Sequence, residues 1–184
     1  MRALAPAFLC ITLASCGASN DPSDNGTITI NDATLTRISL TSDAFKDGQT
    51  IPIQYTCDGD NKSPALSWGD PPLDTKSFAL VIDDPDAPSG TFRHWGVYDI
   101  PASARSIAVG GKAGSEATND KGTPGYTGPC PPSGHGPHHY HFKLFALNVD
   151  SLDLSGNPTV LDIENAAANH TIAQGEMIGI YGRR

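Results

Sequence analysis

The sequence predicts a mainly β fold, an antiparallel β-sandwich with few peripheral helices. Its apolar residues mostly occur in short segments that either alternate with polar residues or are apolar throughout, as strands do. Just one segment shows convincing helical spacing. The 19 glycines and 15 prolines are spread along the chain and therefore mark turns rather than a low-complexity region.

The expected strands begin at Leu35–Leu40. A second strand is expected from Ile51 to Cys57, where apolar and polar residues alternate and Pro52 suits an edge or a strand start. The run Phe78–Ile82 is apolar throughout, which is typical of a strand buried on both faces. The remaining expected strands are Trp95–Ile100, Tyr140–Leu147 and Met177–Tyr181.

One helix is expected from about Thr159 to His170. Thr159 can cap its N-terminus, and Val160, Ile163 and Ala167 share one face. The segment 110–126 is predicted to be a long irregular loop, and such loops in compact domains are often functional.

The composition fits one globular domain with a sizeable core, since 38% of the 184 residues are hydrophobic and 17% are charged. The formal net charge is −8, and Lys and Arg form no cluster. These two facts argue against a general nucleic-acid-binding protein. They leave room for a local anion site, because such a site is built from specific donors rather than from net charge.

The first residues are predicted to be an export signal. Arg2 precedes an apolar stretch, Ala3–Ala14, that is too short to span a bilayer. The following Leu13-Ala14-Ser15-Cys16-Gly17 resembles a bacterial lipobox, in which the cysteine thiol receives the lipid. An ordinary secretory signal cut near Ala18 is the alternative.

The lipobox divides the chain into a signal peptide (1–15), a flexible tether (16–33) rich in small polar residues, and a folded domain (34–184). Acyl groups on Cys16 would anchor the protein stably in the bacterial cell envelope. Gly17 suggests the periplasmic face of the outer membrane if the cell has one.

The segment Asp84-Pro85-Asp86-Ala87-Pro88 follows the buried run directly. A proline disfavours helical geometry in the residue before it, so Asp84 is expected to be extended. In an extended segment, residues two apart tend to lie on one side, so both carboxylates are expected to face the same way. A polar turn after the strand is the alternative, because Asp-Pro pairs commonly form turns.

Several further motifs occur in a fixed order along the chain. They are Tyr55-Thr56-Cys57-Asp58-Gly59, Ser63-Pro64-Ala65-Leu66-Ser67-Trp68, His94-Trp95-Gly96-Val97-Tyr98, Gly128-Pro129-Cys130-Pro131-Pro132-Ser133-Gly134-His135-Gly136-Pro137-His138-His139-Tyr140 and Gly179-Ile180-Tyr181-Gly182-Arg183. With the Asp-Pro-Asp segment, they resemble the phosphatidylethanolamine-binding protein family, in its bacterial Raf-kinase-inhibitor-like branch. The resemblance runs from about Leu35 to the end, and it implies a large central sheet packed on a smaller one.

The resemblance also implies a small anion-binding pocket that holds phosphate-like groups, including a lipid head group. Its residues match Asp84, Asp86, His94, His138 and Tyr140 position by position. The sequence itself is compatible with this grouping, because all five lie at the ends of expected strands. A strand also points residues two apart, such as His138 and Tyr140, to the same face.

These residue types suit a phosphate-like anion or a phospholipid head group. Imidazoles and a tyrosine hydroxyl can donate to phosphate oxygens, and backbone N–H groups around Gly128 and Cys130 can add donors. Carboxylates repel an anion unless they are already engaged. We therefore expect one aspartate to orient an imidazole and the other to accept backbone N–H bonds. No cofactor is expected. The protein could also modulate a protein partner, which the sequence does not identify.

Cys57 and Cys130 each lie in a motif of the resemblance, which places both near one end of the fold. Cys10 leaves with the signal and Cys16 carries the lipid, so these two form an even pair in an oxidising compartment. A Cys57–Cys130 disulfide is expected, with two separate free thiols as the alternative.

Two other functions stay open. A metal could be bound by Cys130 together with a cluster of histidines, His135, His138, His139 and His141. Against this, neighbouring residues on a strand, such as His138 and His139, point to opposite faces, and the sequence has no CxxC or HExxH spacing. An Asp/His pair could also serve a hydrolase-like enzyme. The sequence lacks a Gly-x-Ser-x-Gly elbow, a P-loop and a dinucleotide motif, which favours a binding protein over an enzyme. Some members of the family inhibit kinases or proteases, but those activities depend on partner surfaces that the pocket motifs do not encode.

Overall fold

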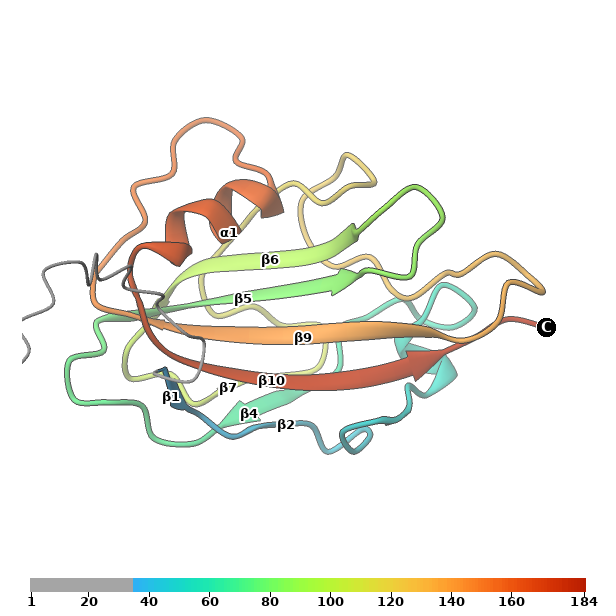
Figure 1. Ribbon diagram of the computed structural model, residues 1–184, viewed down its shortest axis with the longest axis horizontal. Coiled ribbons are helices and arrows are strands. Elements are labelled where there is room, and N and C mark those ends of the chain that lie inside the picture. The colour runs from blue at the N-terminus through green and yellow to red at the C-terminus, as the bar shows by residue number, and fades with distance from the viewer. Residues whose placement is uncertain (1–34) are drawn as a thin grey trace, which may run out of the picture. The chain divides into compact units, whose positions relative to one another are not determined.

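The computed structural model describes residues 35–184 (Figure 1). The expected signal peptide, Cys16 and nearly all of the expected tether lie outside the described residues. The strands are β1 (Thr36–Arg37), β2 (Leu40–Thr41), β3 (Gln49–Thr50), β4 (Leu66–Trp68), β5 (Ser77–Asp84), β6 (Phe92–Pro101), β7 (Ser106–Ile107), β8 (Ser115–Glu116), β9 (His138–Leu147) and β10 (Thr171–Tyr181). A short 3-10 helix (Ile53–Tyr55) and one α-helix, α1 (Val160–Ala168), complete the described elements.

The strands form two sheets, as expected for a mainly β sandwich. The larger has seven strands in the order β1-β10-β9-β5-β6-β8, with β3 also pairing with β10. Its four long strands, β10, β9, β5 and β6, are antiparallel neighbours, whereas β1 and β3 run parallel to β10. The smaller antiparallel sheet has the order β2-β4-β7. Figure 1 shows the long strands side by side, with α1 against β5 and β6.

The central strand β5 is buried at every position, as the apolar run predicts. Phe78, Leu80 and Ile82 belong to one core cluster, together with residues of the small sheet such as Leu66 and Trp68. The alternate residues of β5, Ala79 and Val81, belong to a second cluster with α1. Both faces of the strand are therefore covered, because successive side chains on a strand point to opposite faces.

The helix begins where the sequence predicts. Thr159 Oγ1 accepts from the backbone N–H of Asp162 at 3.3 Å, and Asp162 Oδ2 accepts from the backbone N–H of Thr159 at 2.8 Å. This reciprocal pair is a capping box, which satisfies two otherwise unpaired donors. Gly96 of β6 lets the helix approach closely, since a Cβ there would lie 2.8 Å from Ile163 and 2.9 Å from Val160.

The expected strand from Ile51 to Cys57 is wrong. Pairing with β10 stops at β3, and Pro52 then leads into the 3-10 helix. The hydroxyl of Thr56 donates to the carbonyl of Ile53 at 2.8 Å, which closes the turn. Local side-chain bonding of this kind competes with sheet pairing, and the alternation of side chains does not reveal it.

The antiparallel order gathers three strand ends at one edge of the large sheet. Strand β5 ends at Asp84, its neighbour β6 begins at Phe92, and its other neighbour β9 begins at His138. Antiparallel neighbours bring the end of one strand beside the start of the next, so side chains from distant parts of the sequence meet there. Within residues 35–184, no helix is both long and apolar enough to cross a membrane.

Candidate functional site: a pocket where three strands meet

A pocket of about 510 Å³ opens where β5, β6 and β9 meet. Its wall is largely apolar, formed by Ala87, Pro88, Phe92, Pro131 and Pro132. The polar groups that line it are few: Asp84, His94, His138, Asn61, Lys121, Thr127 and the backbone around Gly128. A mostly apolar cleft with a few placed polar groups is the usual form of a small-molecule site.

Asp84 and His138 form a buried pair in this pocket. Asp84 is 3% exposed and His138 is 2% exposed. Asp84 Oδ2 lies 2.7 Å from His138 Nδ1, and Asp84 Oδ1 accepts from the backbone N–H of Asp86 at 2.9 Å. Because a carboxylate oxygen accepts, His138 Nδ1 donates, and Nε2 is the ring nitrogen left for other partners.

His94 is the second buried imidazole of the pocket, with 4% of its surface exposed. Its Nδ1 donates to the carbonyl of Thr127 at 2.7 Å. Burial lowers the pKa of His94, although the Thr127 carbonyl and the charge of Asp84 act in the opposite direction. A neutral His94 that donates through Nδ1 carries a lone pair on Nε2, so at neutral pH it accepts a hydrogen bond.

Tyr140 lies beneath the pocket rather than in its lining, because the residue is fully buried. Its ring packs edge-on against His94 at a centroid distance of 5.2 Å and lies 6.5 Å from the ring of His138. Among the described residues, its hydroxyl has no partner in hydrogen-bonding geometry. Burial, and then the nearby charge of Asp84, raise the pKa of Tyr140, which keeps the hydroxyl protonated.

Asp86 does not share the pocket with Asp84, so the expectation that both face one way is wrong. The chain turns after Asp84 instead of continuing extended, and Asp86 is exposed. Asp86 Oδ2 accepts from His139 Nδ1 at 2.7 Å and from the backbone N–H of His139 at 2.9 Å. These bonds lower the pKa of Asp86, the one from the imidazole having the larger effect.

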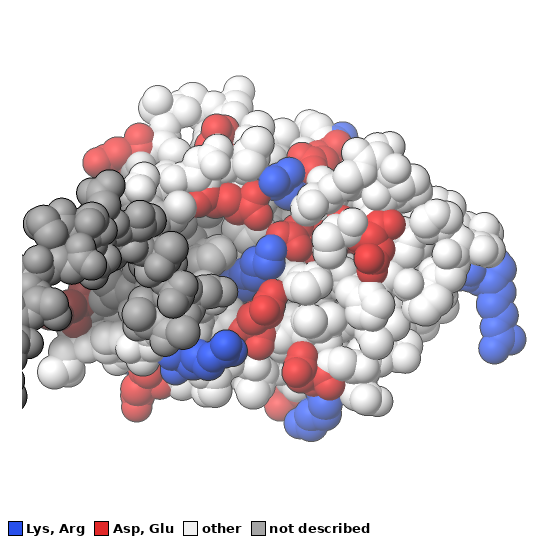
Figure 2. All heavy atoms as spheres, viewed as in Figure 1, with Lys and Arg blue, Asp and Glu red and all other residues white. Residues whose placement is uncertain are grey.

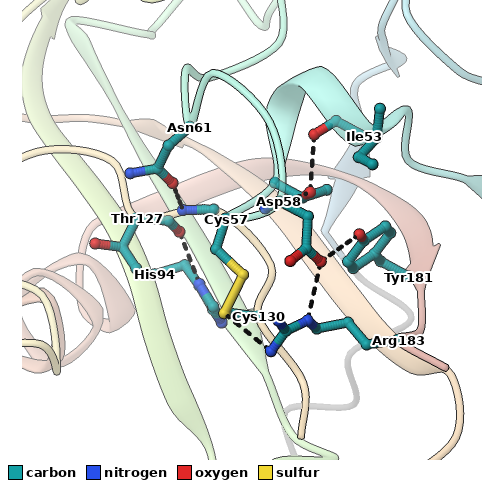
Figure 3. The surroundings of a disulfide bond; sticks show 11 residues. Ile53, Cys57, Asp58, Asn61, His94, Thr127, Cys130, Tyr181 and Arg183 are labelled. Carbon is teal, nitrogen blue, oxygen red and sulfur yellow. Dashed lines mark hydrogen bonds and ion pairs between the residues drawn. A yellow bond between two sulfur atoms is a disulfide. The ribbon is translucent and has the colours of Figure 1, made fainter. Parts of the chain in front are cut away.

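A disulfide between Cys57 and Cys130 forms part of the pocket wall (Figure 3). The Cα atoms are 5.4 Å apart, and the backbone N–H of Cys57 donates to the carbonyl of Pro129 at 3.1 Å. The wall segment that begins at Gly128 is thereby tied to the segment after the 3-10 helix.

The backbone N–H of Gly128 donates to Asn61 Oδ1 at 2.7 Å. This amide is therefore already engaged, contrary to the expectation that it would serve an anion. Gly128 is required at this position because a Cβ would lie 2.7 Å from the carbonyl oxygen of Tyr55 and 2.9 Å from Thr56 Cα.

The C-terminal residues hold this wall from outside. Asp58 Oδ2 accepts from Tyr181 OH at 2.7 Å and pairs with Arg183 Nε at 2.9 Å, and both contacts lower the pKa of Asp58 (Figure 3). The other end of the guanidinium lies 3.9 Å from Cys130 Sγ. The closing motif of the sequence therefore has a structural role at the disulfide.

Sequence reasoning missed three polar residues of the lining, Asn61, Lys121 and Thr127. Lys121 lies in the segment 110–126, which the sequence predicts to be a long irregular loop and in which the structure places strand β8; the length of the predicted loop was the one available signal. Its ammonium adds a positive charge to the pocket rim. Asn61 gave no signal, because its role depends on the approach of Gly128 from 67 residues away.

The alternative of a metal centre finds no support in residues 35–184, where no group of three or more His, Cys, Asp and Glu side chains is arranged to hold an ion. Cys130 is oxidised, and His139 and His141 turn outward to Asp86 and Glu176. Within the lining, the hydroxyl of Thr127 accepts a hydrogen bond from the side-chain amide of Asn119.

The chain is similar to known proteins over most of this domain. A sequence model described as phosphatidylethanolamine-binding protein matches residues 41–182. The chain is 49% identical over 148 residues to the UPF0098 protein of Aquifex aeolicus, a match that covers 77% of this chain and 86% of that one. It is also 38% identical over 146 residues to LppC of Mycobacterium tuberculosis, a lipoprotein candidate by its name, covering 78% of this chain and 72% of the relative.

The fold is likewise found among solved structures. Escherichia coli YbcL, described as a member of the mammalian PEBP family, has a TM-score of 0.75 and 33% identity, with 80% of this chain and 99% of that one covered. The homologue CT736 of Chlamydia trachomatis has a TM-score of 0.75 and 35% identity, with 81% and 99% covered. Sequence and structure agree, and the chain belongs to the phosphatidylethanolamine-binding protein family.

Proposed function

We propose that this protein is a membrane-tethered binding protein whose pocket takes a phosphate-type anion or a phospholipid head group. The observation that carries the proposal is His138, a buried imidazole oriented by Asp84 at the inner end of a largely apolar pocket. Charged imidazole donates a strong, charge-assisted hydrogen bond to a phosphate oxygen.

The charges of the pocket suit an anion despite the presence of a carboxylate. Asp84 already accepts two hydrogen bonds, and with a protonated His138 the pair is neutral overall. Lys121 then supplies a net positive charge at the rim. On the face shown in Figure 2, acidic and basic side chains are interspersed rather than gathered in one patch.

His94 determines a second property of the ligand that the pocket favours. Its neutral Nε2 accepts a hydrogen bond, so it favours a ligand that carries a donor as well as an anion. A singly protonated phosphate offers a P–OH group, and phosphoethanolamine offers an ammonium. Both are small enough for a pocket of about 510 Å³, which is within the usual size of small-molecule sites.

The proposed tether is a lipid on Cys16, followed by a linker to the domain. Support comes from the lipobox-like sequence at Cys16 and from the relative LppC, which is named as a lipoprotein candidate. A lipid anchor would hold the pocket close to a membrane surface, where phospholipid head groups are abundant.

Calorimetric titration of phosphate and of phosphoethanolamine into the purified protein tests this function. His138→Ala should lose one charge-assisted bond, roughly 1.5–3 kcal/mol of binding free energy. His141→Ala is the matched control, because this histidine lies on the same strand but bonds to Glu176 outside the pocket. Equal affinity of the wild type and the His138 variant would refute the proposal.

A further inference from the structure

His138 is less available to a ligand than its position suggests. Its Nδ1 is taken by Asp84, and its Nε2 lies 2.8 Å from Nδ1 of His135. The two rings meet edge to face, with centroids 5.1 Å apart. Both ring nitrogens of the proposed anion-binding imidazole are therefore hydrogen-bonded within the protein.

The hydrogen bond between the two histidines contains a single proton. One nitrogen donates and the other accepts, so a single proton lies between His135 Nδ1 and His138 Nε2. A ligand oxygen can receive a hydrogen bond from His138 Nε2 only when this bond is broken and Nε2 itself carries a proton, in addition to the proton that Nδ1 donates to Asp84. His135 and the ligand thus compete for the same atom.

His135 belongs to a segment that can give way without disturbing the core. It is exposed and ends a tight turn, in which its backbone N–H donates to the carbonyl of Pro132 at 3.1 Å. The glycines on either side have φ values of 76° and 98°, a conformation that glycine adopts at little cost. The turn is anchored at Gly134, whose N–H donates to the carbonyl of Arg183 at 3.1 Å.

We propose that His135 is a displaceable cap on the pocket, which occupies His138 Nε2 until a phosphate-type anion replaces it. This inference rests on the proposed function and adds a residue that regulates it. His135 is absent from the pocket lining, so it acts as a competitor of the ligand rather than as a further ligand contact.

The bond between the two imidazoles requires that one of the two facing nitrogens lacks a proton, because two N–H groups that face each other cannot form a hydrogen bond. The charged or titratable groups around the pair come from β5 and the turn after it, from β6, from β9 and from the loop 110–126; they are Asp84, Asp86, His94, Tyr140 and Lys121. Asp84 accepts from His138 Nδ1, so the exchange between His135 and the ligand takes place at Nε2.

The test compares inorganic phosphate binding by the wild type, His135→Ala and the control His141→Ala, by calorimetry at pH 8. The cap predicts that His135→Ala binds about threefold to tenfold more tightly than the wild type at pH 8, the factor that one net hydrogen bond carries. His141→Ala should match the wild type.

The possible failures are distinct. Phosphate binding that is weakened by His138→Ala but equal in the wild type and His135→Ala at pH 8 would overturn the cap and leave the proposed function standing. Weaker binding by His135→Ala at pH 8 would also overturn it, because His135 would then be a ligand contact. An absence of phosphate binding in every variant would remove the proposed function, and the cap with it.

Discussion

Removal of the Cys57–Cys130 disulfide should both destabilise the domain and loosen one wall of the pocket. The two cysteines are 73 residues apart, and their bridge closes a loop that contains β4, β5, β6, β7 and β8. For a loop of this length, the chain-entropy model gives about 4.4 kcal/mol at 25 °C. In a domain of about 150 residues, that loss corresponds to a fall of roughly 9–18 °C in Tm.

The double variant Cys57→Ala/Cys130→Ala isolates this effect, because both residues are exposed and little packing is lost. Chemical unfolding in urea, with and without a thiol-free reductant, measures it. The reductant should destabilise the wild type by the same amount and leave the double variant unchanged. A double variant within about 1 kcal/mol of the wild type would refute the reasoning. Phosphate binding should weaken in parallel, since the bridge is part of the pocket wall.

Three further predictions concern single residues. Because the pKa of His94 is lowered in the folded protein, this histidine takes up its proton at a higher pH in the unfolded chain than in the folded one. The free energy of unfolding should therefore fall as the pH drops below about 6.5, by at most about 1.4 kcal/mol per pH unit. Urea unfolding midpoints of His94→Gln should depend less on pH than those of the wild type. Gly128→Ala should cost about 1–3 kcal/mol by overpacking against Tyr55 and Thr56, and an unchanged unfolding midpoint would contradict the close contact. Cys16→Ser should release the protein from the membrane fraction, because the acyl chains provide the binding energy; normal processing with unchanged membrane partition would exclude the lipid anchor.

The sequence reveals those parts of the fold that depend on local patterns. The apolar run 78–82 predicts a strand buried on both faces, and Thr159 predicts the start of the helix. Both predictions are confirmed, because burial on a strand and capping of a helix leave a periodic or short-range signal.

The parts that could not be predicted depend on individual side-chain hydrogen bonds, some within one turn and others to partners distant in sequence. The strand expected at Ile51 to Cys57 is replaced by a turn that side-chain bonds close. Asp86 leaves the pocket because His139, 53 residues away, offers two donors outside it. The amide of Gly128 is taken by Asn61, and Nε2 of His138 by His135. None of these choices follows from the periodicity of the chain.

The most direct test of the pocket assignment is an experimental structure of the protein with phosphoethanolamine. The account predicts that a phosphate oxygen lies within hydrogen-bonding distance of His138 Nε2, that His135 has moved away from this atom, and that the Asp84–His138 bond is kept. A head group bound elsewhere, or a His135–His138 bond that persists beside the bound phosphate, would contradict it.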